Sequence, residues 1–334
     1  MPRKIRIEYP GALYHVINRG NYRSWIFKTA GARKSFLETL KECCSVTGWK
    51  LHAWCLMGNH YHLCIETPEA NLVEGMRWLQ SVFANRFNRF RKSSGHVFQG
   101  RYKAILLDGE ALGAVCHYIH LNPVRAGIVE CQELEKYRHS SFYQLWHPGK
   151  RWRFCDHNTA LDWAGHLVDS PEGRRLYREY LGWLSEEDQE QKRLGFVRMS
   201  RGWAKGSKEF KDRILSGLSE EKLDQVVEAD AAGIRSHKWE REMPALLEAL
   251  GVDLEDAKSG RKGEPWKVAA ARYLREKYLA PYKWITRELS MGAVGSVQAL
   301  VCRHRNAGKG AGDPWWEKLE RFERGGALQD GNGE

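Results

Sequence analysis

Strand-like and helix-like stretches alternate along the first 125 residues. The hydrophobic pattern predicts strands over 12–17, 49–57, 60–67 and 97–107. It predicts amphipathic helices over 30–46, 71–91 and 110–121. This order of elements is that of a split β-α-β unit in a ferredoxin-like antiparallel sheet. We therefore expect an α+β fold with helices on one face of the sheet and the other face open, followed by a mostly α-helical C-terminal region.

Two histidines share one face of the strand predicted over 60–67. Successive side chains of a strand point to opposite faces, so His60 and His62 point to the same side. Imidazole is a common ligand of divalent cations, although a metal site needs a third ligand. The alternative is a half-buried strand that presents two histidines to solvent or to polar neighbours. Glu66 shares their face, but a carboxylate at a strand end is more often a surface residue.

Tyr118 and Asn122 lie four residues apart in the next predicted helix and therefore share a face. A helical tyrosine is most often a core residue, and Asn122 precedes Pro123, which favours the end of a helix. His120 lies on a different face and is interpreted as structural or phosphate-facing. Two imidazoles, an amide oxygen and a phenol would suit a cation that polarises a phosphodiester while the tyrosine attacks it.

The remainder of the chain is predicted to be mainly helical. Residues 151–200 form a helical extension and linker, with a soft boundary in the charged run 185–193. Residues 201–325 form a second helical region, and 326–334 a disordered tail.

A segment of that second region, about 265–306, has the pattern of a helix-turn-helix and resembles the DnaA-like form. The positions expected in its core are Ile285, Leu289, Val297 and Leu300. The candidates for groove or phosphate contacts on its second helix are Ser296, Gln298, Arg303 and Arg305. A plain helical hairpin that only serves the fold is the alternative.

The composition indicates the kind of partner and the compartment. Lys and Arg number 53 against 42 Asp and Glu, so the formal net charge is +11, which favours a polyanionic partner such as nucleic acid. The eight cysteines lack paired C-x-x-C spacing, which is typical of reduced thiols. We see neither a secretory signal nor an apolar run of about eighteen residues and expect a cytoplasmic, nucleoid-associated protein without a membrane partner.

Four motifs occur in order within the first 150 residues. They are PGALYHV at 10–16, LMGNHYH at 56–62, FQGRYK at 98–103 and YIHLNPVRA at 118–126. Together they resemble the single-tyrosine HUH transposases of the IS200 type, and within these the REP-associated tyrosine transposases. Gly58 stands where relatives often carry proline, a change in the turn that removes no chemical group.

The resemblance implies that residues 1–150 are an HUH catalytic domain and assigns roles to its side chains. Tyr118 would be the nucleophile that forms a 5′-phosphotyrosine, and His60, His62 and Asn122 would hold Mg²⁺ or Mn²⁺. The cations expected to contact DNA are Arg19, Arg101, Lys103 and Arg125. The implied substrate is single-stranded DNA folded into hairpins, such as repetitive extragenic palindromes (REP).

Other functions and assemblies stay open at this point. A non-catalytic DNA-binding protein or transcriptional regulator could retain the fold, although an intact His-x-His motif and Tyr118 argue against it. A zinc-dependent hydrolase lacks a third strong ligand and a general base. The chain could act as a monomer or a homodimer, and the C-terminal region could bind duplex DNA.

Overall fold

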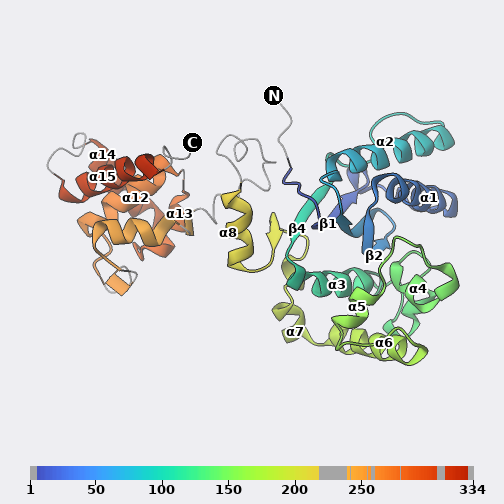
Figure 1. The fold of residues 1–334 in the computed structure, drawn as a ribbon. Coiled ribbons are helices and arrows are strands. Elements are labelled where there is room, and N and C mark those ends of the chain that lie inside the picture. The colour runs from blue at the N-terminus through green and yellow to red at the C-terminus, as the bar shows by residue number, and fades with distance from the viewer. Residues whose placement is uncertain are drawn as a thin grey trace. The chain divides into compact units, whose positions relative to one another are not determined.

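The computed structural model describes residues 6–217, 239–240, 242–253, 255–256, 260–278, 280–306 and 313–329, with backbone only from 323. The chain divides into two compact units, Met1–Asp230 and Ala231–Glu334 (Figure 1). The first unit extends well past the boundary that the charged run 185–193 suggested. The reason is that the chain returns to the sheet after this run, where Leu106 N donates to Trp203 O (2.9 Å).

The first unit is built on one mixed sheet with the strand order β2-β3-β1-β4-β5. The strands are β1 (Ala12–Arg19), β2 (Lys50–Leu56), β3 (His60–Thr67), β4 (Lys103–Leu107) and β5 (Ala204–Lys205). The first four are antiparallel to their neighbours, whereas β5 is parallel to β4. The predicted strand 97–107 is shorter than expected because Gly100 has a φ of 64°, which interrupts extended backbone. The α+β class is confirmed, but the sheet is mixed rather than wholly antiparallel.

Helices cover both faces of this sheet, which corrects the expectation of one open face. Helices α1 (Ala30–Thr47) and α2 (Leu72–Arg91) pack on the face to which Tyr61 points, where its ring lies 4.9 Å from that of Phe36. Helix α3 (Leu112–Arg125) packs on the opposite face (Figure 1). Much of that face is apolar, so residues such as Cys64 and Ile105 need cover, which Val115 and Ile119 of α3 supply.

Helix α3 continues through Pro123 to Arg125, beyond the predicted end at 121. Proline removes one N–H donor and therefore costs the helix a single hydrogen bond at this position. The following turn is retained because Ala126 N donates to Asn122 O (3.1 Å). The helix thus keeps Tyr118 and Asn122 on one continuous face.

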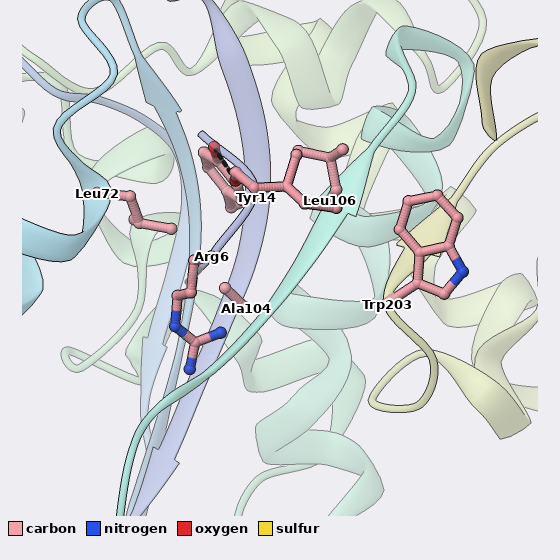
Figure 2. A pocket seen from close by; sticks show the side chains of 7 residues that line it. Arg6, Tyr14, Leu72, Ala104, Leu106 and Trp203 are labelled. Carbon is pink, nitrogen blue, oxygen red and sulfur yellow. Dashed lines mark hydrogen bonds between the residues drawn. The ribbon is translucent and has the colours of Figure 1, made fainter. Parts of the chain in front are cut away.

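Five further helices follow α3 in the described part of the first unit. They are α4 (Ser141–Trp146), α5 (Asn158–Asp162), α6 (Pro171–Glu186), α7 (Asp188–Arg193) and α8 (Lys208–Ser216), with a 3₁₀ turn at Phe196–Arg198. Several side chains line a cavity of about 20 Å³ on the α2 side of the sheet, namely Arg6, Tyr14, Leu72, Ala104, Leu106 and Trp203 (Figure 2). Its volume admits at most one water, so this part of the unit is closely packed.

The second unit is helical, as predicted. Its helices include α12 (Pro265–Lys277), α13 (Tyr282–Glu288), α14 (Val294–Asn306) and α15 (Pro314–Gln329), and residues 242–250 are also helical. The core positions expected for the helix-turn-helix are inside, with Ile285, Leu289 and Val297 buried and Leu300 packed against them. The expected tail begins within α15, which continues to Gln329, and 330–334 lie outside the described residues. No helix of the described chain is long and apolar enough to span a membrane.

Candidate active site

The paired histidines lie on β3, on the face covered by α3. Antiparallel register sets His60 opposite Arg19 and His62 opposite Ile17 of β1, so these side chains share one face. The two imidazole centroids are 5.1 Å apart. His62 is buried and His60 is half-buried at the end of the strand. The predicted pairing of the histidines is therefore present.

Hydrogen bonds fix which nitrogen of each imidazole carries the proton. The carbonyl of Met199 can only accept, so His15 Nδ1 donates to it (3.2 Å). His15 Nε2 then accepts from His62 Nδ1 (2.9 Å), which leaves the lone pair of His62 on Nε2. His60 Nδ1 donates to the Asn59 side-chain oxygen (2.7 Å), and its lone pair is likewise on Nε2. Both histidines therefore present an unprotonated Nε2, the form that binds a metal ion.

Burial keeps these imidazoles neutral. It lowers the pKa of His15 to about 3 and that of His60 to about 4, with the nearby Arg19 adding to the effect on His60. Burial also lowers the pKa of His62 well below its ordinary value, and the neighbouring His15 and His60 lower it further. The assignment of one proton to each imidazole requires neutral rings, and the lowered pKa values of these histidines support it.

Tyr118 lies directly against this group. Its ring centroid is 5.7 Å from that of His62 and 5.9 Å from that of His15, each in an edge arrangement. Its hydroxyl oxygen is 3.3 Å from the Ser200 hydroxyl, and the Phe196 ring packs edge-on against it at 5.4 Å. The side chain is half-buried. A phenol that packs against the His62 imidazole and is partly open to solvent is accessible enough to act as a nucleophile.

Asn122 lies one turn further along α3. Its amide nitrogen donates to the Tyr118 carbonyl of the same helix (2.9 Å), which leaves the amide oxygen as the atom that could reach a cation. Among the described residues, no cluster of three or more His, Cys, Asp or Glu side chains could hold a metal ion. A cation at this site would therefore need the amide oxygen, or water, beside the two imidazoles.

The four cations predicted to contact DNA differ in their surroundings. Arg125 is exposed, lies over the Tyr118 ring at 5.2 Å and donates to Gln191 (2.9 Å). Arg19 is half-buried and close enough to lower the pKa of His60. Lys103 donates to Ser200 O (2.7 Å), which ties it to the wall of the site, and Arg101 is exposed in the loop before β4. Arg125 thus lies against Tyr118, and Arg19 lies close to His60.

Other polar residues of the sequence have structural partners. His120 is buried and bonds Tyr177 and Ser141, each at 2.8 Å, in agreement with the structural interpretation. Glu66 is half-buried at the end of β3 and pairs with His52 at 3.2 Å. Neither residue contributes to the group around Tyr118.

The segment 196–200 completes the site and was not identified from the sequence. It supplies the Met199 carbonyl, the Ser200 hydroxyl and the Phe196 ring, all beyond the charged run taken as a boundary. The one available signal was the apolar composition of Phe196 and Met199 just after nine polar residues. The structure also adds His15, which lies on β1 opposite Cys64 and therefore two residues along β3 from His62.

A family model and a solved structure match parts of this chain. Residues 9–122 match the family model described as Transposase IS200 like, and this segment contains His60, His62, Tyr118 and Asn122. One solved structure that matches is described as the REP-associated tyrosine transposase bound to a REP hairpin. It shares 17% identity, covers 48% of this chain and 92% of that chain, and has a TM-score of 0.37. A search of the curated proteins found no match. The family match confirms the resemblance within residues 9–122.

Proposed function

We propose that this chain, whose residues 9–122 match the IS200-like transposases, is a metal-dependent endonuclease and strand transferase for single-stranded DNA. The observation that carries the proposal is the position of the Tyr118 ring, 5.7 Å from that of His62. A core tyrosine would not need neutral imidazoles on one side and solvent on the other. The arrangement instead suits attack on a phosphodiester.

Tyr118 would act as the nucleophile. Its phenolic oxygen bonds to phosphorus, the bond from phosphorus to the 3′ oxygen breaks, and that oxygen takes up a proton as the phenol loses one. The products are a 5′-phosphotyrosine on the protein and a free 3′-hydroxyl. Attack by another 3′-hydroxyl on the phosphotyrosine reverses the exchange and joins two DNA ends, with little net change in bond energy.

The metal-binding groups would be Nε2 of His60, Nε2 of His62 and the amide oxygen of Asn122. A divalent ion bound there would polarise the scissile phosphate and offset its charge. Imidazole nitrogen is a better ligand for transition ions than for Mg²⁺, so the donor set favours Mn²⁺ of the two expected ions.

Two arginines would contribute positive charge near the scissile phosphate. Arg125 lies over the Tyr118 ring, where its positive charge would be close to a phosphate attacked by Tyr118. Arg19 lies at the end of β1 beside His60, in reach of a phosphate held between the histidines and Tyr118. Gln191 from α7 orients Arg125, so the region after the sheet takes part in the site.

The substrate proposed is a hairpin in single-stranded DNA, as the family resemblance implies. Incubation of the protein with Mn²⁺ and an oligonucleotide hairpin, labelled at either end, tests the function on a denaturing gel. A 3′ label should move into a protein-sized band, and a 5′ label should appear in a shortened strand with an extendable 3′-hydroxyl. Intact strands under all conditions, or a free 5′-phosphate without adduct, would contradict the proposal.

The second unit would add binding to duplex DNA through α14. Its candidate contacts, Ser296, Gln298, Arg303 and Arg305, are all exposed. Replacing both arginines by alanine should make the salt dependence of duplex affinity shallower by a slope of about 1.8, since each phosphate contact contributes about 0.9. Arg321→Ala on α15 is the matched control. An unchanged slope in the double variant would leave α13 and α14 as a plain helical hairpin.

A further inference from the structure

A cavity of about 310 Å³ lies next to the proposed active site, within the first unit. Its lining comes from the start of α3, the segment after α7 and the turn from β5 into α8. The residues are Glu110, Ala111, Ala114, Arg193, Leu194, Gly195, Met199, Lys205, Gly206 and Ser207. Most of them follow residue 122 and lie outside the segment that matches the transposase family.

The cavity and the nucleophile share the same two walls. Ala111, Ala114 and Tyr118 are spaced three and four residues apart and form one stripe along α3, so the cavity begins one helical turn, about 5.4 Å, from Tyr118. In the opposite wall, Gly195 and Met199 line the cavity, while Phe196 and Ser200 contact Tyr118. A strand of DNA with one phosphate at Tyr118 would therefore place its neighbouring nucleotide at this cavity.

The lining suits a nucleobase better than a phosphate. Alanine, leucine and methionine side chains make an apolar wall, and a small number of polar groups surround it, as in other small-molecule sites. Glu110 would repel an anion from the interior, whereas a carboxylate can accept from the exocyclic amino group of a base such as cytosine.

Positive charge gathers at the edge of the cavity. Lys205 donates to Arg198 O (2.6 Å), and its pKa is lowered to about 8 by partial burial and by the nearby cations Lys211, Lys103 and Arg198. This concentration of cations favours a polyanion over a neutral ligand.

We propose that the cavity holds the base of the nucleotide adjacent to the bond that Tyr118 attacks, with Lys205 facing that nucleotide's phosphate. This inference rests on the proposed function and extends it, because it assigns a base-binding subsite to residues 193–207. Its size admits one base, so a single position of the substrate should depend on it.

Titration of the full-length protein with dCMP, followed by isothermal titration calorimetry, measures binding at the cavity and requires no cleavage. Ala114→Leu fills the cavity and should weaken dCMP binding about tenfold or more. Lys205→Ala should weaken it several-fold, and Lys208→Ala, an equal charge change on the exposed side of α8, should leave it unchanged. Inorganic phosphate should compete poorly. Equal binding of phosphate and dCMP, or equal dCMP affinity in the folded Ala114→Leu protein, would overturn the proposal.

A second measurement uses the wild-type protein and so does not depend on how any variant folds. The cleavage site in the hairpin is mapped first, and an abasic position is then moved through the strand around it. Cleavage should fall about tenfold or more at one position next to the cut and little elsewhere; a loss spread evenly over all positions, or none at the adjacent ones, would contradict the subsite. If no oligonucleotide is cleaved, the proposed function fails, and the dCMP titration still decides whether the cavity binds a base.

Discussion

The two faces of the central sheet differ in what they contribute to the protein. Under α1 and α2, aromatic rings pack against one another, with Phe36 5.2 Å from Phe83 and 4.9 Å from Tyr61. Under α3, the same strands present His15, His60 and His62 among apolar neighbours. Because alternate residues of one strand point to opposite faces, a single sequence supplies a stabilising core and a reactive surface.

This difference predicts how substitutions on each face of the sheet should affect the protein. Rings on the aromatic face stabilise the fold through burial and edge contacts, which are non-directional to a first approximation. The histidine face depends on directed hydrogen bonds, each of which sets the proton position of the next ring. Substitutions on the first face should therefore change stability, and those on the second should change chemistry.

Removing the two candidate histidine ligands should have the largest effect on cleavage. Replacement of His60 and His62 by alanine should abolish divalent-dependent cleavage and adduct formation, because only Asn122 of the three proposed ligands is left to hold the ion. Circular dichroism and hairpin binding should change little. The control is His166→Ala, which removes a highly exposed imidazole on a distant loop. Excess EDTA should do to the wild type what the double substitution does, and full cleavage in EDTA would contradict a role for metal.

Acid should destabilise the protein through its buried histidines on β1 and α3. Burial lowers the pKa of His117 to about 4 and holds that of His120 well below its ordinary value, as it does for His15. Between pH 6.5 and 5 the unfolded chain binds protons at these positions and the folded chain does not, so stability is lost as pH falls. Each histidine that stays neutral in the fold costs about 2 kcal/mol over this interval.

Urea denaturation at pH 7 and at pH 5 measures this loss. A free energy of unfolding that falls by several kcal/mol agrees with three or more buried neutral histidines. Stability independent of pH over this interval would show that these imidazoles are accessible to protons in the folded state.

Truncating the aromatic face should cost stability while sparing the chemistry. Phe83→Ala should lower the free energy of unfolding by about 3–5 kcal/mol, because it leaves a cavity among Phe27, Phe36 and Phe98. The variant should melt at a lower temperature than the wild type. At temperatures where it is still folded, it should form the covalent adduct at a rate near that of the wild type. If Phe83→Ala kept its stability and lost cleavage, the aromatic face would have a role in the reaction, which would contradict this account.

His15→Phe should give the smallest effect on this scale. The ring volume is kept, but the bond that orients His62 is lost, and such loss of a supporting partner typically lowers metal affinity or activity about 10–100-fold. Higher Mn²⁺ concentration should restore part of the rate, which a defect in folding would not show. An unchanged Mn²⁺ dependence would reduce His15 to a packing residue.

Local patterns predicted much of the fold and part of the site. The bounds of β3 agree with the expected strand 60–67, because alternation and the turn at Gly58 and Asn59 mark both the strand and its face. The core of the second unit, with Ile285 and Val297, also follows from helical spacing alone. Features set by short-range periodicity were therefore accessible from the sequence.

Contacts between segments far apart in the sequence could not be predicted from local patterns. His15 and Met199 are separated by 184 positions, and β5 is only two residues long, so neither leaves a periodic pattern. The charged run before Phe196 predicted a boundary, whereas in the structure it forms the solvent-facing α7 inside the first unit. Cover for the second face of the sheet also came from segments far along the chain, such as α4 and α5, which pack against β2.

The central claim is that Tyr118 is the nucleophile, and adduct formation by Tyr118→Phe tests it most directly. The wild type, Tyr118→Phe and the control Tyr143→Phe are each incubated with Mn²⁺ and a 3′-labelled hairpin, and the protein-bound label is quantified after denaturation. We expect no adduct from Tyr118→Phe, wild-type yield from Tyr143→Phe, and hairpin binding nearly unchanged in both, because only one hydroxyl is removed. Adduct of undiminished yield in Tyr118→Phe would contradict the account and place the nucleophile elsewhere.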